Sequence, residues 1–222
     1  MKIALIGATG FVGAAVLTEL IDRDHQVTAI VRDPAKALPA GVAVAVADAF
    51  DAAAIAAAVA GVDAVISAFN PGWDAPDLYD KFLRGSAAIE QGVAASGVKR
   101  LLVVGGAGSL FVAPGVQLVD TASFTDHVPA KVVPGARAAR DALIRLQGDT
   151  QLDWTFISPP AMLAPGARSG AYRLGADELL MDGDGDDRTP AGISVADLAV
   201  AIVDDLERPR HLRARFTVAS AA

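Results

Sequence analysis

Short apolar runs alternate with longer segments of helical spacing along the whole chain. Residues 2–6 form a continuous apolar run, residues 11–23 repeat apolar side chains at helical intervals, and residues 26–31 are rich in β-branched side chains. This order predicts a strand, a helix and a second strand, which form a βαβ unit. The same patterns predict further strands at 42–47, 63–69, 100–106, 153–158 and 215–220, and further helices at 51–60, 76–96, 135–147 and 195–206, the last with Ser194 as its N-cap.

The alternation predicts an α/β fold in which a single domain spans residues 1–222. Each parallel pairing needs a crossover that a helix supplies, so we expect a doubly wound parallel sheet with helices on both faces. Strands that read as unbroken apolar runs agree with a sheet covered on both sides. Two long irregular segments, 106–134 and 159–193, follow strands at the edge where such sheets bind ligands, and we expect them to form substrate-side loops.

The segment GATGFVG places glycines at positions 7, 10 and 13 between the first strand and the first helix. At this spacing Gly7 allows a tight turn, Gly10 leaves room for a pyrophosphate near the backbone, and Gly13 lets the helix pack close to the strand. Amides at the helix N-terminus then face the phosphates. A glycine-rich turn without a ligand is the alternative, but strand, turn and helix follow in the order that dinucleotide binding requires.

The end of the second predicted strand favours NADP(H) over NAD(H). An acidic residue at this point would hold the ribose 2′-OH of NAD, whereas this strand ends with Val31 and Arg32. A guanidinium matches a 2′-phosphate in charge and in bidentate geometry, and Lys36 offers a second cation. The alternative is a surface arginine beside Asp33 and Pro34, which together favour a helix start.

Composition argues against several other classes of function. The formal net charge of -7 and the lack of a lysine or arginine cluster argue against a nucleic-acid partner. The longest strongly apolar stretch, 52–62, is shorter than the roughly 18 to 20 residues of a membrane span, and residue 2 leads directly into a strand, so we expect a cytoplasmic protein without a membrane partner. The chain has no cysteine, so redox chemistry needs a bound cofactor.

No metal site is expected. The segment MDGDGDDRTP at 181–190 carries the alternating aspartates of a calcium loop, but Asp187 stands where that loop needs glycine and Ile193 stands where it needs glutamate. A solvated hairpin turn is the better interpretation of this segment.

Six segments together resemble one protein family: GATGFVG, VRDPAK, VADAFD, DAVISAFNPG, LLVVGGAGSL and DWTFISPPAML. They are similar to the atypical short-chain dehydrogenases/reductases with an NAD(P)H-binding domain, a group that includes NmrA-like proteins, biliverdin reductase B-like flavin reductases and small quinone reductases. The resemblance implies a Rossmann-like fold in which residues 48–49 lie beside the adenine, residues 67–70 line the cofactor, and residues 105–106 face the nicotinamide. With the glycine turn, the expected cofactor contacts are Gly7, Thr9, Gly10, Phe11, Val12, Gly13, Arg32, Asp48, Ala49, Ala68, Phe69, Asn70, Gly105, Gly106 and Pro159.

The chain departs from that family at the general acid. Relatives that act on alcohols and ketones carry a Tyr-x-x-x-Lys pair, but Tyr79 and Tyr172 are followed at the fourth position by Leu83 and Ala176. Carbonyl reduction forms a basic alkoxide and needs a positioned acid, whereas flavins and quinones spread the added charge over conjugated rings. We therefore expect a reductase of a small-molecule flavin or quinone. An NmrA-like NADP(H) sensor without turnover is the alternative, and a nucleotide-sugar epimerase or dehydratase is the weakest interpretation.

Three residues are candidate catalytic substitutes for the missing acid. Ser109 follows the fifth strand, where the family often has a hydroxyl, and a turn-stabilising serine is the equal alternative. His127 and Lys131 stand four apart in the first long segment, but Pro129 between them opposes a helix, and a solvated loop pair is the alternative. The sequence leaves a homodimer open.

Overall fold

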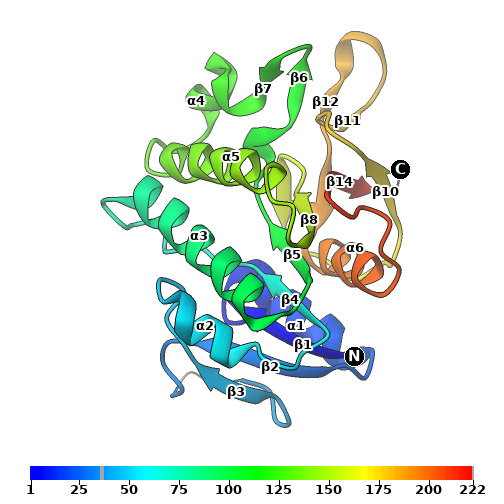
Figure 1. Cartoon of the computed structure of the whole chain (residues 1–222). Helices are drawn as coiled ribbons and strands as arrows, with labels where there is room; N and C mark the ends of the chain where they lie inside the picture. Colours follow the sequence, from blue (N-terminus) through cyan, green and yellow to red (C-terminus); the bar gives the residue numbers. More distant parts are fainter. Residues whose placement is uncertain (36–37, 222) are drawn as a thin grey trace.

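An eight-stranded sheet forms the centre of the computed structural model, which describes residues 1–35 and 38–221 (Figure 1). The sheet consists of β1 (Lys2–Ile6), β2 (Gln26–Val31), β3 (Ala43–Val46), β4 (Ala64–Ser67), β5 (Arg100–Val104), β8 (Asp153–Ser158), β10 (Tyr172–Gly175) and β14 (Ala214–Ser220). Their order is β10-β14-β8-β5-β4-β1-β2-β3, and all neighbours pair in parallel except β10, which lies antiparallel to β14 at one edge.

The direction in which the sheet grows reverses between β1 and β4. The chain first builds β2 and β3 on one side of β1, and then crosses to β4, β5, β8 and β14 on the other side. Ile6 at the end of β1 accordingly pairs with Ile30 of β2 and with Ser67 of β4. A reversal of this kind leaves a crevice at the C-terminal ends of the strands, so the ends of β1 and β4 mark the expected ligand site.

Helices cover both faces of the sheet (Figure 1). Their bounds are α1 (Phe11–Asp22), α2 (Ala52–Ala58), α3 (Leu78–Ser96), α4 (Ala122–His127), α5 (Val133–Gln147) and α6 (Val195–Glu207). Leu20 of α1 and Ile202 of α6 belong to one buried apolar cluster, and Ile55 of α2, Ile89 of α3 and Leu143 of α5 belong to a second one. Among the described residues, no helix has both the length and the apolar character to cross a membrane.

These features confirm the predicted α/β fold, a Rossmann-like doubly wound sheet with helices on both faces. The strands β2 and β8 occupy the predicted ranges. Ser194 caps α6 as expected, because its hydroxyl oxygen accepts a hydrogen bond from the amide of Asp197 at 3.0 Å. The local pattern of apolar residues therefore located seven of the eight strands of the sheet, all except β10.

The two long segments contain more regular structure than predicted. Residues 106–134 form the 3₁₀ helices η1 (Ala107–Ser109) and η2 (Leu118–Asp120), the hairpin β6 (Phe111–Ala113) to β7 (Val116–Gln117), and α4. Residues 159–193 form β9 (Met162–Ala164) beside β13 (Gly192–Ser194), the edge strand β10, and β11 (Met181–Asp182) paired with β12 (Thr189–Pro190) around η3 (Gly185–Asp187). The β11–β12 pair confirms the predicted hairpin, whereas the prediction of an irregular segment is wrong for β10.

Candidate functional site

A cavity of about 470 Å³ opens where the strand order reverses, and we call it the switch-point cavity. Its volume lies in the range of ligand pockets in enzymes. Four segments form its wall: the turn after β1, the end of β2, the loop after β3 and the loop after β4. The wall residues are Ile6, Gly7, Ala8, Thr9, Gly10, Ile30, Val31, Arg32, Asp33, Ala47, Ala49, Ala68, Phe69 and Asn70.

Glycines shape the turn after β1 because side chains would not fit. Gly7 has a φ of +83°, and a Cβ there would lie 2.8 Å from the carbonyl carbon of Ala68 and closer still to its oxygen. A Cβ on Gly13 would lie 2.7 Å from the carbonyl carbon of Gly7 and would overlap its oxygen. The bare turn therefore lets the start of α1 pack against the ends of both β1 and β4.

The N-terminus of α1 faces this turn with its amides unshielded. Gly10 is the N-cap, and within the described part of the chain no side chain caps the helix and no acidic residue lies in its first turn. The first amides of a helix and its dipole attract anions. The turn and the helix start thus form a site suited to a phosphate group.

Arg32 stands in the cavity wall at the end of β2, with an exposed side chain. The neighbouring Asp33 also lines the wall, but its Oδ1 accepts a hydrogen bond from the amide of Ala35 at 2.9 Å. That contact fixes the Asp33 carboxylate in a local turn, and the alternative of a surface arginine beside a helix start stays open, because residues 36 and 37 lie outside the described residues. Lys36, the expected second cation, lies outside the described residues.

The loop after β3 closes the cavity with small apolar side chains. Ala47 and Ala49 are buried and line the wall, whereas the exposed Asp48 does not. The Asp48 carboxylate accepts a hydrogen bond from the amide of Phe50 at 3.0 Å, and so it shapes this turn. Asp51 then caps α2 by accepting from the amides of the next turn.

The loop after β4 supplies Ala68, Phe69 and Asn70 to the cavity wall. Asn70 Oδ1 accepts a hydrogen bond from the amide of Gly72 at 2.7 Å, and Gly72 has a φ of +111°. The side chain of Asn70 thus closes a local turn in the loop after β4.

The remaining expected cofactor residues are not among those that line the switch-point cavity. Phe11 is exposed, and Val12 packs against the core under α1. Pro159 is buried at the end of β8. Gly105 has a structural reason to be glycine, because a Cβ there would overlap the ring of Phe156, whereas a Cβ on Gly106 would meet no atom of the described residues within 4 Å.

Ser109 lies in a buried network and not on an accessible surface. Its side chain and backbone together are 1% exposed. Its Oγ lies 3.1 Å from Ser158 Oγ and donates to the carbonyl of Gly106 at 3.3 Å. This geometry favours the turn-stabilising role over the catalytic one, so we correct the expectation that Ser109 contacts substrate.

His127 and Lys131 are exposed and are not on one helix. α4 ends at His127, whose Nδ1 lies 2.8 Å from the carbonyl oxygen of Ser123 in the same helix. Lys131 Nζ forms an ion pair with Asp74 at 2.7 Å, which links the first long segment to the loop after β4. Neither residue lines the switch-point cavity. The structure brings neither of them to the phosphate site.

Both tyrosines are held by helix aspartates away from the cavity. Tyr79 OH donates to Asp141 at 2.6 Å, and Tyr172 OH donates to Asp204 at 2.6 Å. The hydrogen bond to Asp141 raises the pKa of Tyr79, and burial together with Asp204 raises the pKa of Tyr172. A raised pKa makes each phenol a weaker acid, and each hydroxyl proton is donated to an aspartate.

Arg215 of β14 joins the two long segments, and sequence analysis missed it. Its side chain is 3% exposed. It donates to the carbonyl of Ser109 and to both the carboxylate and the carbonyl of Asp177, and its guanidinium lies over the ring of Phe111. The backbones of Phe111 and Leu179 are also hydrogen-bonded at 2.9 Å. Nothing in the local sequence around residue 215 signals these contacts.

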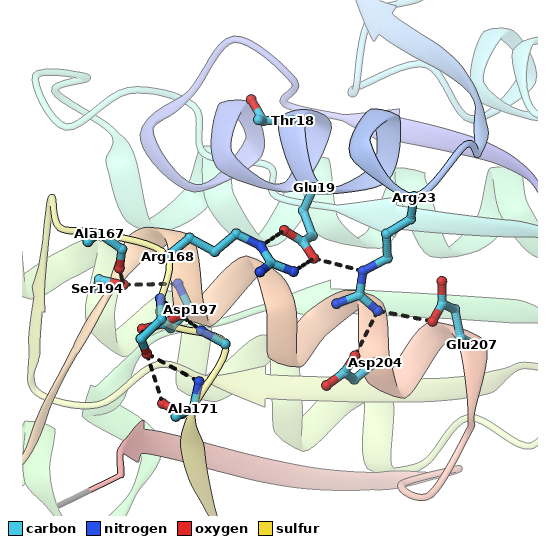
Figure 2. A network of polar contacts seen from close by, with 12 residues as sticks. Thr18, Glu19, Arg23, Ala167, Arg168, Ala171, Ser194, Asp197, Asp204 and Glu207 are labelled. Carbon is cyan, nitrogen blue, oxygen red and sulfur yellow. Dashed lines mark hydrogen bonds and ion pairs between the residues drawn. The ribbon is translucent and has the colours of Figure 1, made fainter.

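A second polar network ties residues 167–171 to α1 and α6 (Figure 2). Glu19 of α1 is 3% exposed and accepts hydrogen bonds from Arg168 and from Arg23, each at 2.7 Å. The hydrogen bond from Arg168, with that from Arg23, lowers the pKa of Glu19 against the effect of burial. Asp197 of α6 accepts from the amides of Ser169 and Gly170 at 2.8 Å. Residues 167–171 of the second long segment are thus fixed to α6 and to α1, the helix that begins at the glycine turn.

Comparisons with known proteins agree with this geometry. A family model described as NAD(P)H-binding matches residues 7–209. A solved structure from Burkholderia pseudomallei, described as a "putative exported protein", is 44% identical, covers 99% of each chain and has a TM-score of 0.85. A "putative epimerase" from Bacteroides thetaiotaomicron is 42% identical over 100% of this chain and 97% of its own, with a TM-score of 0.87. A "putative NADH-flavin reductase" from Streptococcus pneumoniae is 32% identical over 100% of both chains, with a TM-score of 0.82.

Proposed function

The chain belongs to the NAD(P)H-binding family, and on that premise we propose that it is an NADPH-dependent reductase of a flat conjugated acceptor, such as a flavin or a quinone. The observation that carries the proposal is the switch-point cavity, in which a turn without side chains meets the uncapped start of α1. The described relative from Streptococcus pneumoniae, a "putative NADH-flavin reductase", supports the class of acceptor.

The residues present fit a dinucleotide. The space that a Cβ would fill at Gly7 and Gly13 lets the backbone approach a diphosphate, and the α1 amides would hold its charge. Arg32 would pair with a 2′-phosphate, and the small Ala47 and Ala49 would leave room for the adenine. When bound, the reduced nicotinamide supplies a hydride. The protein's part is to bind and orient the two reactants.

The candidate acids favour an acceptor that needs no acid from the protein, because Ser109 is buried and both tyrosine hydroxyls are bound to aspartates. Among the described residues of the wall, the ionisable ones are Arg32 and Asp33 at the end of β2, on the side expected for the adenosine. Reduction of a ketone without a positioned acid forfeits about 10²- to 10⁴-fold in rate. A flavin or quinone disperses the negative charge over its rings and takes its proton from water.

The second candidate function is a dinucleotide sensor that binds NADP(H) without turnover. The specific observation in its favour is that Ser109 is buried and that His127 and Lys131 stand outside the cavity wall. An epimerase is less well supported, although a relative is described as a "putative epimerase", because both tyrosines are bound to aspartates on helices.

The deciding experiment mixes purified protein with NADPH and either FMN or a benzoquinone and follows absorbance at 340 nm. Loss of absorbance above the protein-free rate supports the reductase. Calorimetric binding of NADPH without consumption across a broad acceptor panel supports the sensor. If neither NADPH nor NADH binds, both proposed functions are refuted. The cytoplasmic location expected from the sequence stays a prediction, which cell fractionation tests.

A further inference from the structure

Gly85 of α3 is buried against two aromatic rings from different loops. A Cβ at this position would lie 2.5 Å from Cε1 of Phe69 and closer still to its Cζ, and 3.3 Å from Cε1 of Phe50. Carbon atoms in contact normally lie about 3.5 to 4.0 Å apart, so even one methyl group would displace the Phe69 ring. Glycine is a poor residue for the interior of a 19-residue helix, so its presence here has a packing reason.

The two rings belong to an aromatic cluster made of Phe50, Phe69 and Phe82. The rings of Phe50 and Phe69 meet edge to face with centroids 5.9 Å apart, and Phe82 of α3 lies 6.1 Å from Phe69. The guanidinium of Arg84 lies over Phe50 at 5.4 Å. Edge-to-face and tilted arrangements of this kind are favourable for aromatic pairs, so the cluster is a defined packing unit.

The two loop residues of this cluster, Phe50 and Phe69, lie next to or in the wall of the switch-point cavity. Phe50 directly follows Ala49, which lines the side expected for the adenine, and Phe69 lines the cavity itself after β4. The amide nitrogen of Phe69 would also lie 3.4 Å from a Cβ on Gly7. Phe69 is therefore packed between the glycine turn on one side and α3 on the other, and the cluster couples two wall loops through one helix.

The geometry points to Gly85 as a positioning residue for dinucleotide binding, which acts through Phe69 and Phe50 without being part of the cavity wall. This inference rests on the proposed function, because it assumes that the switch-point cavity binds the cofactor. A methyl group on Gly85 moves the Phe69 ring toward Phe50 or toward the cavity, and both displacements change the wall that the cofactor contacts. α3 thus sets the shape of a site that it does not touch.

The test is calorimetric titration of Gly85→Ala with NADPH. The variant should bind at least about tenfold more weakly than the wild type, because overpacking of this size displaces neighbouring groups. Alanine has the higher helix propensity, so a weakened helix cannot explain the loss. Phe82→Leu loosens the same cluster without adding volume, and it should weaken binding in the same direction if Gly85→Ala fails to fold.

Val93→Ala is the matched control on the same helix. Val93 is fully buried and lies eight residues further along α3, about 12 Å away at 1.5 Å per residue. This variant should lower the melting temperature yet change the Kd by no more than about twofold, as expected for independent sites at this distance. An equal loss of affinity in Val93→Ala and Gly85→Ala would show a general effect of stability and would overturn the inference.

A double-mutant cycle with Phe69→Leu tests the route of the effect. The smaller side chain makes room for the methyl group, so Gly85→Ala combined with Phe69→Leu should lose less affinity than the two single losses added together. Additive losses, or binding by Gly85→Ala within twofold of the wild type, would refute the inference and leave the proposed function intact. A wild-type protein that binds neither NADPH nor NADH would instead refute the proposed function, and the inference with it.

Discussion

Replacement of Arg32 by alanine tests the proposed preference for NADPH over NADH. Arg32 lies in the wall of the switch-point cavity at the end of β2 with an exposed side chain, and the proposed function places the 2′-phosphate of NADPH against it. NADH has no such phosphate. Arg32→Ala should therefore weaken the binding of NADPH and leave the binding of NADH nearly unchanged.

The expected size of the effect follows from the charge and the exposure of this contact. A hydrogen bond to a charged group contributes about 1.5 to 3 kcal/mol, which corresponds to about 10- to 150-fold in Kd. Because the Arg32 side chain is exposed, solvent and salt screen the pair, and we expect the lower end of this range at physiological ionic strength. Arg32→Lys should retain part of the affinity, because it keeps the charge and loses the bidentate geometry.

Calorimetric titrations with NADPH and with NADH, at low salt and again at high salt, measure this difference. Asp33→Asn is an informative companion variant, since it removes a negative charge from the same part of the wall and retains an oxygen for the amide of Ala35. It should strengthen the binding of NADPH relative to NADH. Equal losses for both dinucleotides in Arg32→Ala would refute the assignment of this residue to the 2′-phosphate.

Three further variants test the turn, the buried network and the tyrosines. Gly13→Ala should abolish dinucleotide binding and lower the melting temperature, since its Cβ would overlap the backbone of Gly7. Glu19→Gln should flatten the acid side of the stability profile measured by chemical denaturation, because Arg168 holds the pKa of Glu19 below its ordinary value. The stability that the Glu19 carboxylate contributes is present above pH 4.5 and is lost as the pH falls through its folded-state pKa. Tyr79→Phe should lose about 1.5 kcal/mol of unfolding free energy, the lower end for a hydrogen bond to a charged group because Tyr79 is only half-buried, and should leave any NADPH-dependent turnover unchanged.

Each of these variants has a control that carries the opposite expectation. Gly106→Ala should melt close to the wild type, because its Cβ would meet no described atom within 4 Å, and a large drop would contradict the steric argument. Glu178→Gln, at an exposed position between β10 and β11, should keep the acid limb that Glu19→Gln loses. A fall in turnover for Tyr79→Phe at unchanged stability would restore a tyrosine acid and contradict the proposed chemistry.

The sequence alone determined the regular elements and the phosphate end of the candidate site. Strands such as β2 follow from short apolar runs rich in β-branched residues, and helices such as α1 follow from apolar residues at helical spacing, which are local properties of the chain. The glycine turn is equally local, because Gly7, Gly10 and Gly13 act within one βαβ unit. The resemblance carried by the later motifs implied cofactor contacts at residues 48–49 and 67–70, and of these Ala49 and residues 68–70 line the cavity.

Only the tertiary structure decided what the other candidate residues do, because their partners are far away in the sequence. Ser109 is buried by Ser158 and by Arg215, which stand 49 and 106 residues away from it. The edge strand β10 exists through its pairing with β14 and not through any period of its own. Gly85 looks like a weak point in a helix until Phe69 is placed against it. Periodicity encodes which face of an element is buried, whereas the identity of the atoms that meet there is set only when the chain is packed.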